Sequence, residues 1–382
     1  MFRKLEQRVD AYILEHEEEA LELLKSIARI PAPSCHEEKR AAFVKQWLED
    51  QGAQGVFIDE ALNVVYPLGD TGKNRLDVFM AHTDVVFPDT EELPVRLEEG
   101  RIFAPGIGDD TANLSALLLA AQYITREKLS PRDGRGLILA ANAGEEGLGN
   151  LKGARRICAD YGDRIDTFVS FDGTYEKITS QAVGSRRYRI TVYTEGGHSY
   201  QDFGNRNAIA YLASMINTLY ALKAPEGGQT TYNVGTVSGG TSVNTIAQRA
   251  EMLYEFRSDS REDLLYMENH LEAVCAAYRT KGITLECELV GERPCSAPVD
   301  PVRHEALLAR GREAVKRYTG IEAPLTASST DSNIPLSLGI PSMTLGCYYG
   351  RGAHTYEEWV DIASLKAGYR IAFELVLDGL SR

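Results

Sequence analysis

Residues 76–86 read LDVFMAHTDVV, an apolar run that ends in a histidine and an aspartate. Such a run is typical of a strand that is buried on both faces of a sheet. Similar runs alternate along the chain with leucine-rich segments of helical spacing. The further strands are predicted at 135–143, 166–173 and 341–349, and the helices at 3–30, 36–51, 113–129 and 362–379. This alternation predicts an α/β sheet covered on both faces.

The middle of the chain has a different pattern. Residues 186–294 predict the order strand, helix, strand, strand, helix, strand, which is the ferredoxin-like split unit. An insertion of this size is large enough to fold as its own domain. We therefore expect a discontinuous main domain at 1–182 and 296–382, interrupted by an α+β domain at 183–295.

Composition narrows the functional classes. The chain has 382 residues, 43% of them hydrophobic and 25% charged, with a formal net charge of −14. This charge disfavours general binding to nucleic acid or to an anionic membrane. The N-terminal segment lacks the apolar stretch of a signal peptide, and the six cysteines form no CxxC pair, so we expect a cytoplasmic protein with reduced thiols.

Five short segments carry side chains that suit a metal centre. Each has an ordinary structural interpretation as a turn, a helix cap or a solvated loop. We expect all five to lie at strand ends on one edge of the sheet, where ligands bind in open α/β folds. Two histidines and several carboxylates without cysteine suit zinc, cobalt or manganese, and a bridging carboxylate would allow two ions. The segments are AHTDVV (81–86), GIGDD (106–110), AGEEG (143–147), SFDG (170–173) and GAHTYEEW (352–359).

These motifs, together with GGHSYQDFGNRNAI (196–209) and STDSNIP (329–335), resemble a known family. The sequence is similar to the co-catalytic zinc metallopeptidases that include peptidase T, carnosinase, carboxypeptidase G, aminoacylase and succinyl-diaminopimelate desuccinylase. The resemblance covers essentially the whole chain. It implies a zinc-peptidase domain with a mixed sheet flanked by helices, and an inserted lid domain that mediates dimerisation.

The resemblance also implies roles for individual residues. One zinc ion would be held by His82, Asp109 and Asp172, and a second by Asp109, Glu146 and His354, with Asp109 bridging. Glu145 would be the general base, and Asp84 would orient His82. The lid residues His198, Asn244 and Arg257 would contact substrate, and His198 would stabilise the oxyanion across a homodimer. Asp331 would be structural.

The chain departs from the family pattern at two places. The bridging aspartate is followed by Asp110-Thr111-Ala112-Asn113 instead of Asp-x-Lys-Gly, and the lid reads VNTIAQRAE (243–251) instead of asparagine, Ile-Pro and an acidic residue. An aspartate at position 172 goes with the family's aminopeptidases and dipeptidases, and we therefore expect a di- or tripeptide aminopeptidase. A carboxypeptidase, an N-acyl amino acid amidohydrolase and a catalytically silent binding protein of the same fold remain alternatives.

Overall fold

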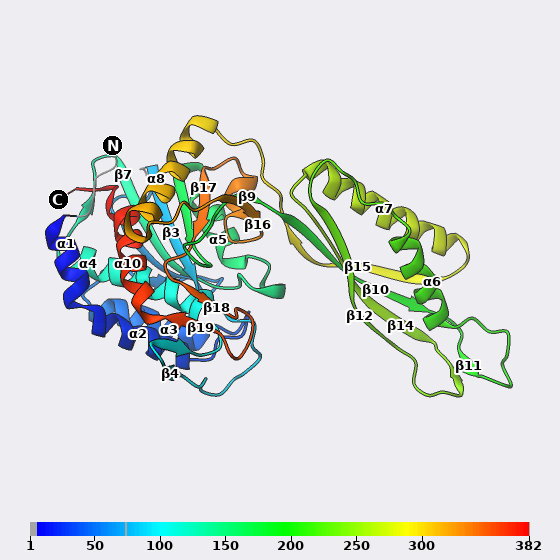
Figure 1. The fold of residues 1–382 in the computed structure, drawn as a ribbon. Helices are drawn as coiled ribbons and strands as arrows, with labels where there is room; N and C mark the ends of the chain where they lie inside the picture. The colour runs from blue at the N-terminus through cyan, green and yellow to red at the C-terminus, as the bar shows by residue number, and fades with distance from the viewer. Residues whose placement is uncertain (1–5, 73–74, 382) are drawn as a thin grey trace. The chain divides into compact units, whose positions relative to one another are not determined.

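The computed structural model describes residues 6–72 and 75–381 (Figure 1). The chain forms two compact units: the larger joins Met1–Ala182 to Ala297–Arg382, and the inserted unit comprises Val183–Ser296. Each unit has its own hydrophobic core.

A mixed eight-stranded sheet forms the centre of the larger unit. Its strands, in spatial order, are β1 (Phe57–Ile58), β2 (Val64–Leu68), β7 (Arg135–Asn142), β3 (Arg75–His82), β8 (Ile165–Phe171), β17 (Ser342–Leu345), β9 (Ile178–Ala182) and β16 (Leu325–Ser328). The four strands β7, β3, β8 and β17 are parallel, and they contain the four apolar runs of the sequence. β2 and β9 flank them in antiparallel pairing. The prediction of an α/β fold with a mixed sheet is confirmed.

Successive residues of the central strands enter different cores. Leu137 and Leu139 of β7 pack into the larger core, whereas Ile138 and Ala140 pack into a second one on the opposite face. This alternation follows from the period of two in a strand, and it explains why the runs are apolar throughout. The first face is covered by α1 (Gln7–Glu15), α2 (Glu17–Arg29), α3 (Glu38–Asp50), α4 (Asn113–Arg126), α8 (Pro301–Thr319) and α10 (Ile362–Leu377). The second face is covered by α5 (Lys152–Tyr161) and α9 (Asn333–Ser337).

Two predicted boundaries were wrong. The helix expected at 3–30 is two helices, because His16 leaves the helical conformation between them and its ring bonds to the carbonyl of Tyr12 at 2.8 Å; residues 3–5 lie outside the described residues. The strand expected at 76–86 ends at His82, because the chain turns there to pair with another segment. Val85 donates its backbone N–H to the carbonyl of Ala32.

A small four-stranded sheet joins distant parts of the larger unit. Its order is β18 (Gly350–Arg351), β19 (Trp359–Asp361), β5 (Arg101–Phe103) and β4 (Arg96–Glu98). Trp359 of β19 pairs with Phe103 of β5 in antiparallel register. The C-terminal loop therefore lies beside the segment that leads into Gly106 and Asp109.

The inserted unit has one antiparallel sheet with two helices. The order is β12 (Thr230–Gly239), β14 (Arg249–Ser258), β10 (Gly184–Tyr193) and β15 (Thr284–Arg293), and α6 (Ala208–Tyr220) and α7 (Arg261–Thr280) share its core. A short pair, β11 (Gly197–His198) with β13 (Thr245–Ile246), extends beyond the sheet. The order along the chain is the βαββαβ order of a ferredoxin-like unit.

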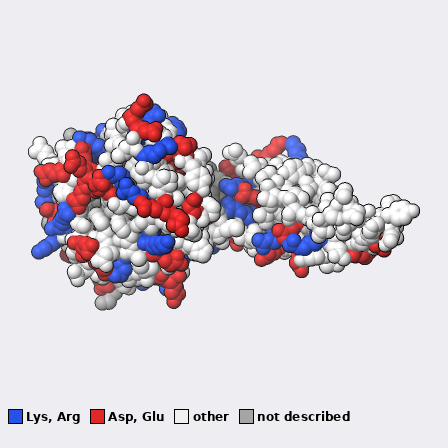
Figure 2. All heavy atoms as spheres, turned by 90° about the horizontal axis from the view of Figure 1, so that it is seen from below, with Lys and Arg blue, Asp and Glu red and all other residues white. Residues whose placement is uncertain are grey.

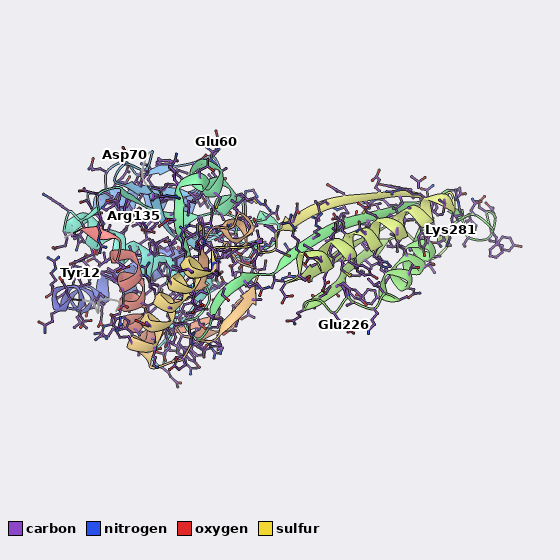
Figure 3. The ribbon with its side chains drawn as sticks, turned by 90° about the horizontal axis from the view of Figure 1, so that it is seen from above. Tyr12, Glu60, Asp70, Arg135, Glu226 and Lys281 are labelled. Atoms are coloured by element: carbon purple, nitrogen blue, oxygen red, sulfur yellow. The ribbon has the colours of Figure 1, made fainter. Side chains whose placement is uncertain are left out.

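Charged side chains of both signs occur on the surface (Figure 2), and those at the amino edge of the central sheet form ion pairs. On the face shown in Figure 2, acidic and basic side chains are interspersed. At the amino edge of the central sheet, Arg135 (Figure 3) pairs with Asp77 at 2.6 Å and with Asp166 at 2.7 Å. The two aspartates at the amino edge are thus paired with an arginine, whereas the carboxylates at the carboxyl edge, described below, lie close to one another and to histidines. Within the described ranges, no helix is both long and apolar enough to cross a membrane.

Candidate metal centre

The carboxyl edge of the central sheet gathers titratable side chains from several strands. His82 is the last residue of β3, Asp172 follows β8 directly, and Glu145 and Glu146 come shortly after β7. The carboxyl ends of parallel strands meet at one edge, so these side chains converge. The expectation that all candidates lie at strand ends was wrong for two of them. Asp109 lies in a π-helical turn (Ile107–Ala112) before α4, and His354 lies in the loop between β18 and β19.

Asp109 lies between the two histidines. Its Oδ1 is 3.0 Å from Nε2 of His82, and its Oδ2 is 3.2 Å from Nε2 of His354. His354 Nε2 is also 2.9 Å from Oε1 of Glu146. One group of converging donor atoms contains His82, Asp109, Asp110 and Asp172; another contains Asp109, Glu146 and His354; in each group the atoms lie within 4.8 Å of one another. Asp109 is therefore shared by two adjacent clusters.

Asp110 is buried beside the first cluster, but both of its carboxylate oxygens accept hydrogen bonds. Oδ2 accepts the backbone N–H of His82 at 2.8 Å, and Oδ1 accepts the side-chain amide of Asn113 at 2.7 Å. The same amide also donates to the carbonyl of Gly173, next to Asp172. Asp110 and Asn113 thus tie three segments of the site together, while Asp109 offers one oxygen to each histidine.

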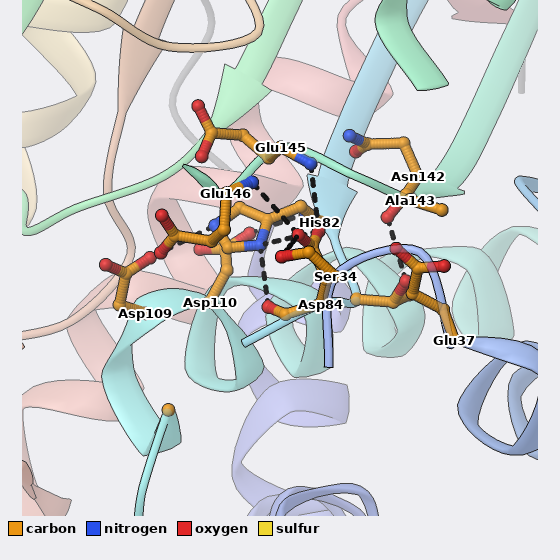
Figure 4. Close-up of polar contacts among 12 residues, drawn as sticks. Ser34, Glu37, His82, Asp84, Asp109, Asp110, Asn142, Ala143, Glu145 and Glu146 are labelled. Carbon is orange, nitrogen blue, oxygen red and sulfur yellow. Dashed lines mark hydrogen bonds and ion pairs between the residues drawn. The ribbon is translucent and has the colours of Figure 1, made fainter. Parts of the chain in front are cut away.

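Asp84 is fully buried and connects three segments (Figure 4). Its Oδ2 accepts the hydroxyl of Ser34 at 2.7 Å and the backbone N–H of Glu146 at 2.9 Å, and its Oδ1 accepts the backbone N–H of Glu145 at 3.0 Å. His82 Nδ1 lies 3.1 Å from the main-chain oxygen of Asp84 and 3.5 Å from its carboxylate. A proton on Nδ1 directed at this oxygen leaves Nε2 free to bind a cation. The carboxylate itself chiefly holds the backbone of the two glutamates.

Glu145 and Glu146 are both buried beside the first histidine. The two residues are 4% and 7% exposed, and a carboxylate oxygen of each lies within 4.8 Å of a ring nitrogen of His82. Gly144, which precedes them, has a φ of +67°, and Lys152 fills the space that a Cβ would need. The turn therefore requires glycine at this position. It directs two adjacent carboxylates into the site.

The charges in the site shift several pKa values. Burial and the neighbouring Asp109 raise the pKa of Asp172 to about 7. Hydrogen bonds to Asp109 and Glu146 raise the pKa of His354 to about 10. Burial lowers the pKa of His82, but the surrounding aspartates outweigh it and raise the pKa well above the usual value. Burial raises the pKa of Asp84, but the contacts with His82 and Ser34 lower it to about 2. Crowded carboxylates of this kind are stabilised by a bound cation.

His354 has an unusual backbone conformation. Its φ is +66°, in the left-handed region that side chains with a Cβ seldom adopt, and its side chain is 56% exposed. Such a conformation costs on the order of 1 kcal/mol and persists where the surroundings enforce it. Here it points an exposed imidazole at Asp109 and Glu146.

The three predicted substrate contacts lie in the inserted unit. His198 in β11 pairs with Thr245, and the carbonyl of Asn244 accepts the N–H of Ser199 at 2.9 Å, so His198 and Asn244 are neighbours. Arg257 pairs with Ser185 at the other end of β10 and forms an ion pair with Glu255 at 2.8 Å. The eight steps along β10 from Ser185 to Tyr193 span about 26 Å at ~3.3 Å per residue. Arg257 is therefore separated from the other two along the sheet of its own unit.

Sequence reasoning missed several residues that support the site. Ser34, Asn113 and Glu358 each bond to a segment that carries a candidate ligand. A signal was available for Glu358, which lies in the same motif as His354. Asn113 lies three residues after Asp110, but its bond to Gly173 spans 60 residues and could not be read from the sequence. Ser34 lies 50 residues from Asp84 and outside the five motifs.

The donor set fits divalent metal ions. It combines two imidazole nitrogens with carboxylate oxygens, and the three cysteines nearest in sequence to these segments, Cys35, Cys158 and Cys347, belong to none of the donor groups. This chemistry suits zinc, cobalt or manganese better than a soft metal. The shared Asp109 and the mutual repulsion of the carboxylates are the features that a cation would stabilise.

Comparison with known proteins places the chain in a family. The sequence profile of peptidase family M20/M25/M40 matches residues 78–378. The uncharacterized protein YqjE of Bacillus subtilis (strain 168) is 23% identical over 369 residues, which cover 92% of this chain and 95% of that protein.

Solved structures share the fold. A tripeptidase from Staphylococcus aureus subsp. aureus Mu50 superposes with a TM-score of 0.76 at 22% identity, over 94% of this chain and 97% of that one. An M20 family metallo-carboxypeptidase from Sulfolobus solfataricus superposes with a TM-score of 0.73 at 16% identity, over 94% and 98%. The profile match spans most of the sequence, and the chain therefore belongs to peptidase family M20/M25/M40, a family of metal-dependent hydrolases.

Proposed function

We propose that the protein is a two-metal aminopeptidase that removes the N-terminal residue of di- or tripeptides. The observation that carries this proposal is the position of Asp109, whose two carboxylate oxygens face one histidine each. His82, Asp109 and Asp172 would hold one ion, and Asp109, Glu146 and His354 would hold the other. We propose zinc for both sites, and cobalt or manganese also fits the donors.

Bound metal ions of this kind polarise a carbonyl and lower the pKa of water. Glu145 is the residue placed to move the proton. Its buried carboxylate adjoins the cluster without being needed as a ligand, and it can take a proton from the attacking water. The new C–O bond forms as the C=O π bond opens to an oxyanion. The C–N bond then breaks as the carbonyl re-forms, and Glu145 returns the proton to the leaving amine nitrogen. Asp84 holds the backbone of Glu145 in place during this transfer.

We propose that the inserted unit supplies the remaining substrate contacts in a homodimer. His198 and Asn244 lie together in the β11–β13 pair, which follows the Tyr193 end of β10. Arg257 pairs at the Ser185 end of β10, about 26 Å from Tyr193 at ~3.3 Å per residue. A di- or tripeptide is much shorter than this separation. If all three residues contact one substrate, the His198 side and the Arg257 side must come from different subunits. The separation is compatible with a homodimer in which His198, the oxyanion donor that the resemblance implies, reaches the partner's centre.

The proposal that the enzyme cleaves at the amino end of its substrate rests on Asp172. The resemblance associates an aspartate at this position with aminopeptidases and dipeptidases. The likeness to a tripeptidase fold is compatible with this direction. A carboxypeptidase is the second candidate, supported by a similar likeness to the Sulfolobus solfataricus enzyme and by an arginine, Arg257, that could bind a substrate carboxylate.

A matched set of peptides tests the proposal. The protein is stripped of metal, reloaded with Zn²⁺ or Mn²⁺, and assayed with Ala-Ala-Ala, with N-acetyl-Ala-Ala-Ala, with Ala-Ala-Ala amide and with N-acetyl-alanine. We expect cleavage of the free and the amidated peptide but not of the two acetylated compounds. Cleavage of the free and the acetylated tripeptide but not of the amide would identify a carboxypeptidase, and release of acetate would identify an amidohydrolase. No turnover with either metal would refute all three activities.

A further inference from the structure

Glu358 is a buried carboxylate that follows His354 by four residues. The residue is 2% exposed, and its side chain points into the turn that carries Asp109. Oε1 accepts the backbone N–H of Asp109 at 2.7 Å and that of Gly108 at 3.0 Å, and Oε2 accepts the backbone N–H of Gly106 at 2.9 Å. Three main-chain donors of one turn thus converge on a single carboxylate.

The turn contains two closely packed glycines. Gly106 has a φ of +68°, and a Cβ there would lie 2.3 Å from Val85. A Cβ on Gly108 would lie 2.5 Å from the hydroxyl of Tyr348. The segment therefore depends on glycines, which are conformationally free, and on an external group that fixes them. Hydrogen bonds from backbone N–H groups to a carboxylate are among the strong ones.

The same residue is anchored through its own backbone. The carbonyl of Glu358 accepts the N–H of Ala104 at 3.2 Å, and its N–H donates to Thr355, the residue after His354. Glu358 consequently contacts the Asp109 turn through its side chain and the His354 loop through its main chain. The distance between these two segments determines where Asp109 Oδ2 meets His354 Nε2.

We infer that Glu358 is a positioning residue for the metal centre: its carboxylate holds Asp109 in place between His82 and His354. It does not act as a ligand, because both of its oxygens are occupied by backbone donors and it belongs to none of the donor groups. This inference rests on the proposed function, in which Asp109 bridges two ions. Partners that orient metal ligands typically contribute 10–100-fold to metal affinity or activity.

The test compares two adjacent glutamates. Glu358→Gln keeps the size of the side chain, but an amide has only one acceptor oxygen, so at least one of the three N–H groups faces an NH₂ group. Glu357→Gln is the matched control, because Glu357 is 73% exposed and pairs with Arg96 at 2.8 Å. The full-length chains are stripped of metal and titrated with Zn²⁺ against a competing chromophoric chelator. Melting of the metal-free proteins is measured in parallel.

We expect Glu357→Gln to bind Zn²⁺ like the wild type and Glu358→Gln to bind it about 10–100-fold more weakly at both sites, since Asp109 serves both. We also expect excess Zn²⁺ to restore kcat with KM unchanged. A lower melting temperature with unchanged Zn²⁺ affinity would show a merely structural role and overturn the inference. If Glu358→Gln does not fold, Glu358→Asp, which keeps the charge but shortens the reach, should show an intermediate affinity; wild-type affinity in that variant would also overturn it. Absence of Zn²⁺ binding by the wild type would instead refute the metal centre of the proposed function.

Discussion

Replacing Asp84 by asparagine should weaken one of the two proposed metal sites more than the other. Asp84 was expected to orient His82, but its carboxylate lies 3.5 Å from the ring, whereas the main-chain oxygen of the same residue lies 3.1 Å away. The main-chain contact survives in Asp84→Asn. The carboxylate contacts with the backbone of Glu145 and Glu146 do not survive intact. We therefore expect the site that contains Glu146 and His354 to weaken more than the site that contains His82.

The magnitude follows from the hydrogen bonds. Three donors reach Asp84: the hydroxyl of Ser34 and the backbone N–H groups of Glu145 and Glu146. An asparagine offers one acceptor oxygen, so at least one buried N–H is left without an acceptor, at a cost of about 1–3 kcal/mol. Loss of the charge makes the surviving bonds weaker, and we expect a total destabilisation of about 2–4 kcal/mol. Ser34→Ala removes only the hydroxyl and should cost about 1 kcal/mol.

The assay has two parts. Denaturant unfolding of the metal-free proteins measures the free energy of unfolding, and Zn²⁺ titration measures two dissociation constants. We expect the dissociation constant of the site that contains Glu146 and His354 to rise about 10–100-fold, with a smaller change at the site that contains His82. Equal weakening of both sites would mean that the carboxylate acts mainly on His82. An unfolding free energy within ~0.5 kcal/mol of the wild type, with both constants unchanged, would refute the reasoning altogether.

Three further predictions concern catalysis and metal loading. Glu145→Gln should keep both metal ions and lose about 10²–10⁴-fold in kcat, as measured by elemental analysis and peptide hydrolysis; near-normal activity would exclude Glu145 as the base. His354→Ala should lose one of two ions, and retention of both would remove His354 from the ligand set. In the metal-free protein the pKa of Asp172 is raised to about 7 and that of His354 to about 10, so both groups carry a proton at pH 6. Metal binding must displace these protons and the one on His82, whose pKa is also raised, so Zn²⁺ affinity should rise from pH 6 to pH 8. Calorimetry in buffers of different ionisation enthalpy should detect about three released protons at pH 6. A pH-independent affinity would contradict this.

The central strands of the sheet could be predicted from the sequence for a physical reason. Parallel strands buried on both faces must be apolar at nearly every position, and β3, β7 and β8 show this plainly. β9 and β16 were missed because they are short strands near one edge of the sheet and carry polar residues, as in ITSQA (178–182). The break at His16 depends on a side-chain bond to the preceding turn, which no periodicity reveals.

The candidate site could be predicted in part for a similar reason. His82 and Asp172 lie at or beside the ends of central strands, so their convergence follows from the sheet. Asp109 and His354 are not at strand ends, and their position depends on pairing between β5 and β19, two strands of three residues each. Glu358 holds these two segments together through backbone N–H groups, which carry no sequence signal.

The central claim is that Asp109 bridges two metal ions, and anomalous diffraction from crystals of the Zn²⁺-loaded protein tests it most directly. The account predicts two peaks per chain, about 3.5–4 Å apart, with one beside His82 and Asp172, the other beside Glu146 and His354, and Asp109 between them. A single peak, or two peaks that do not share Asp109, would contradict it.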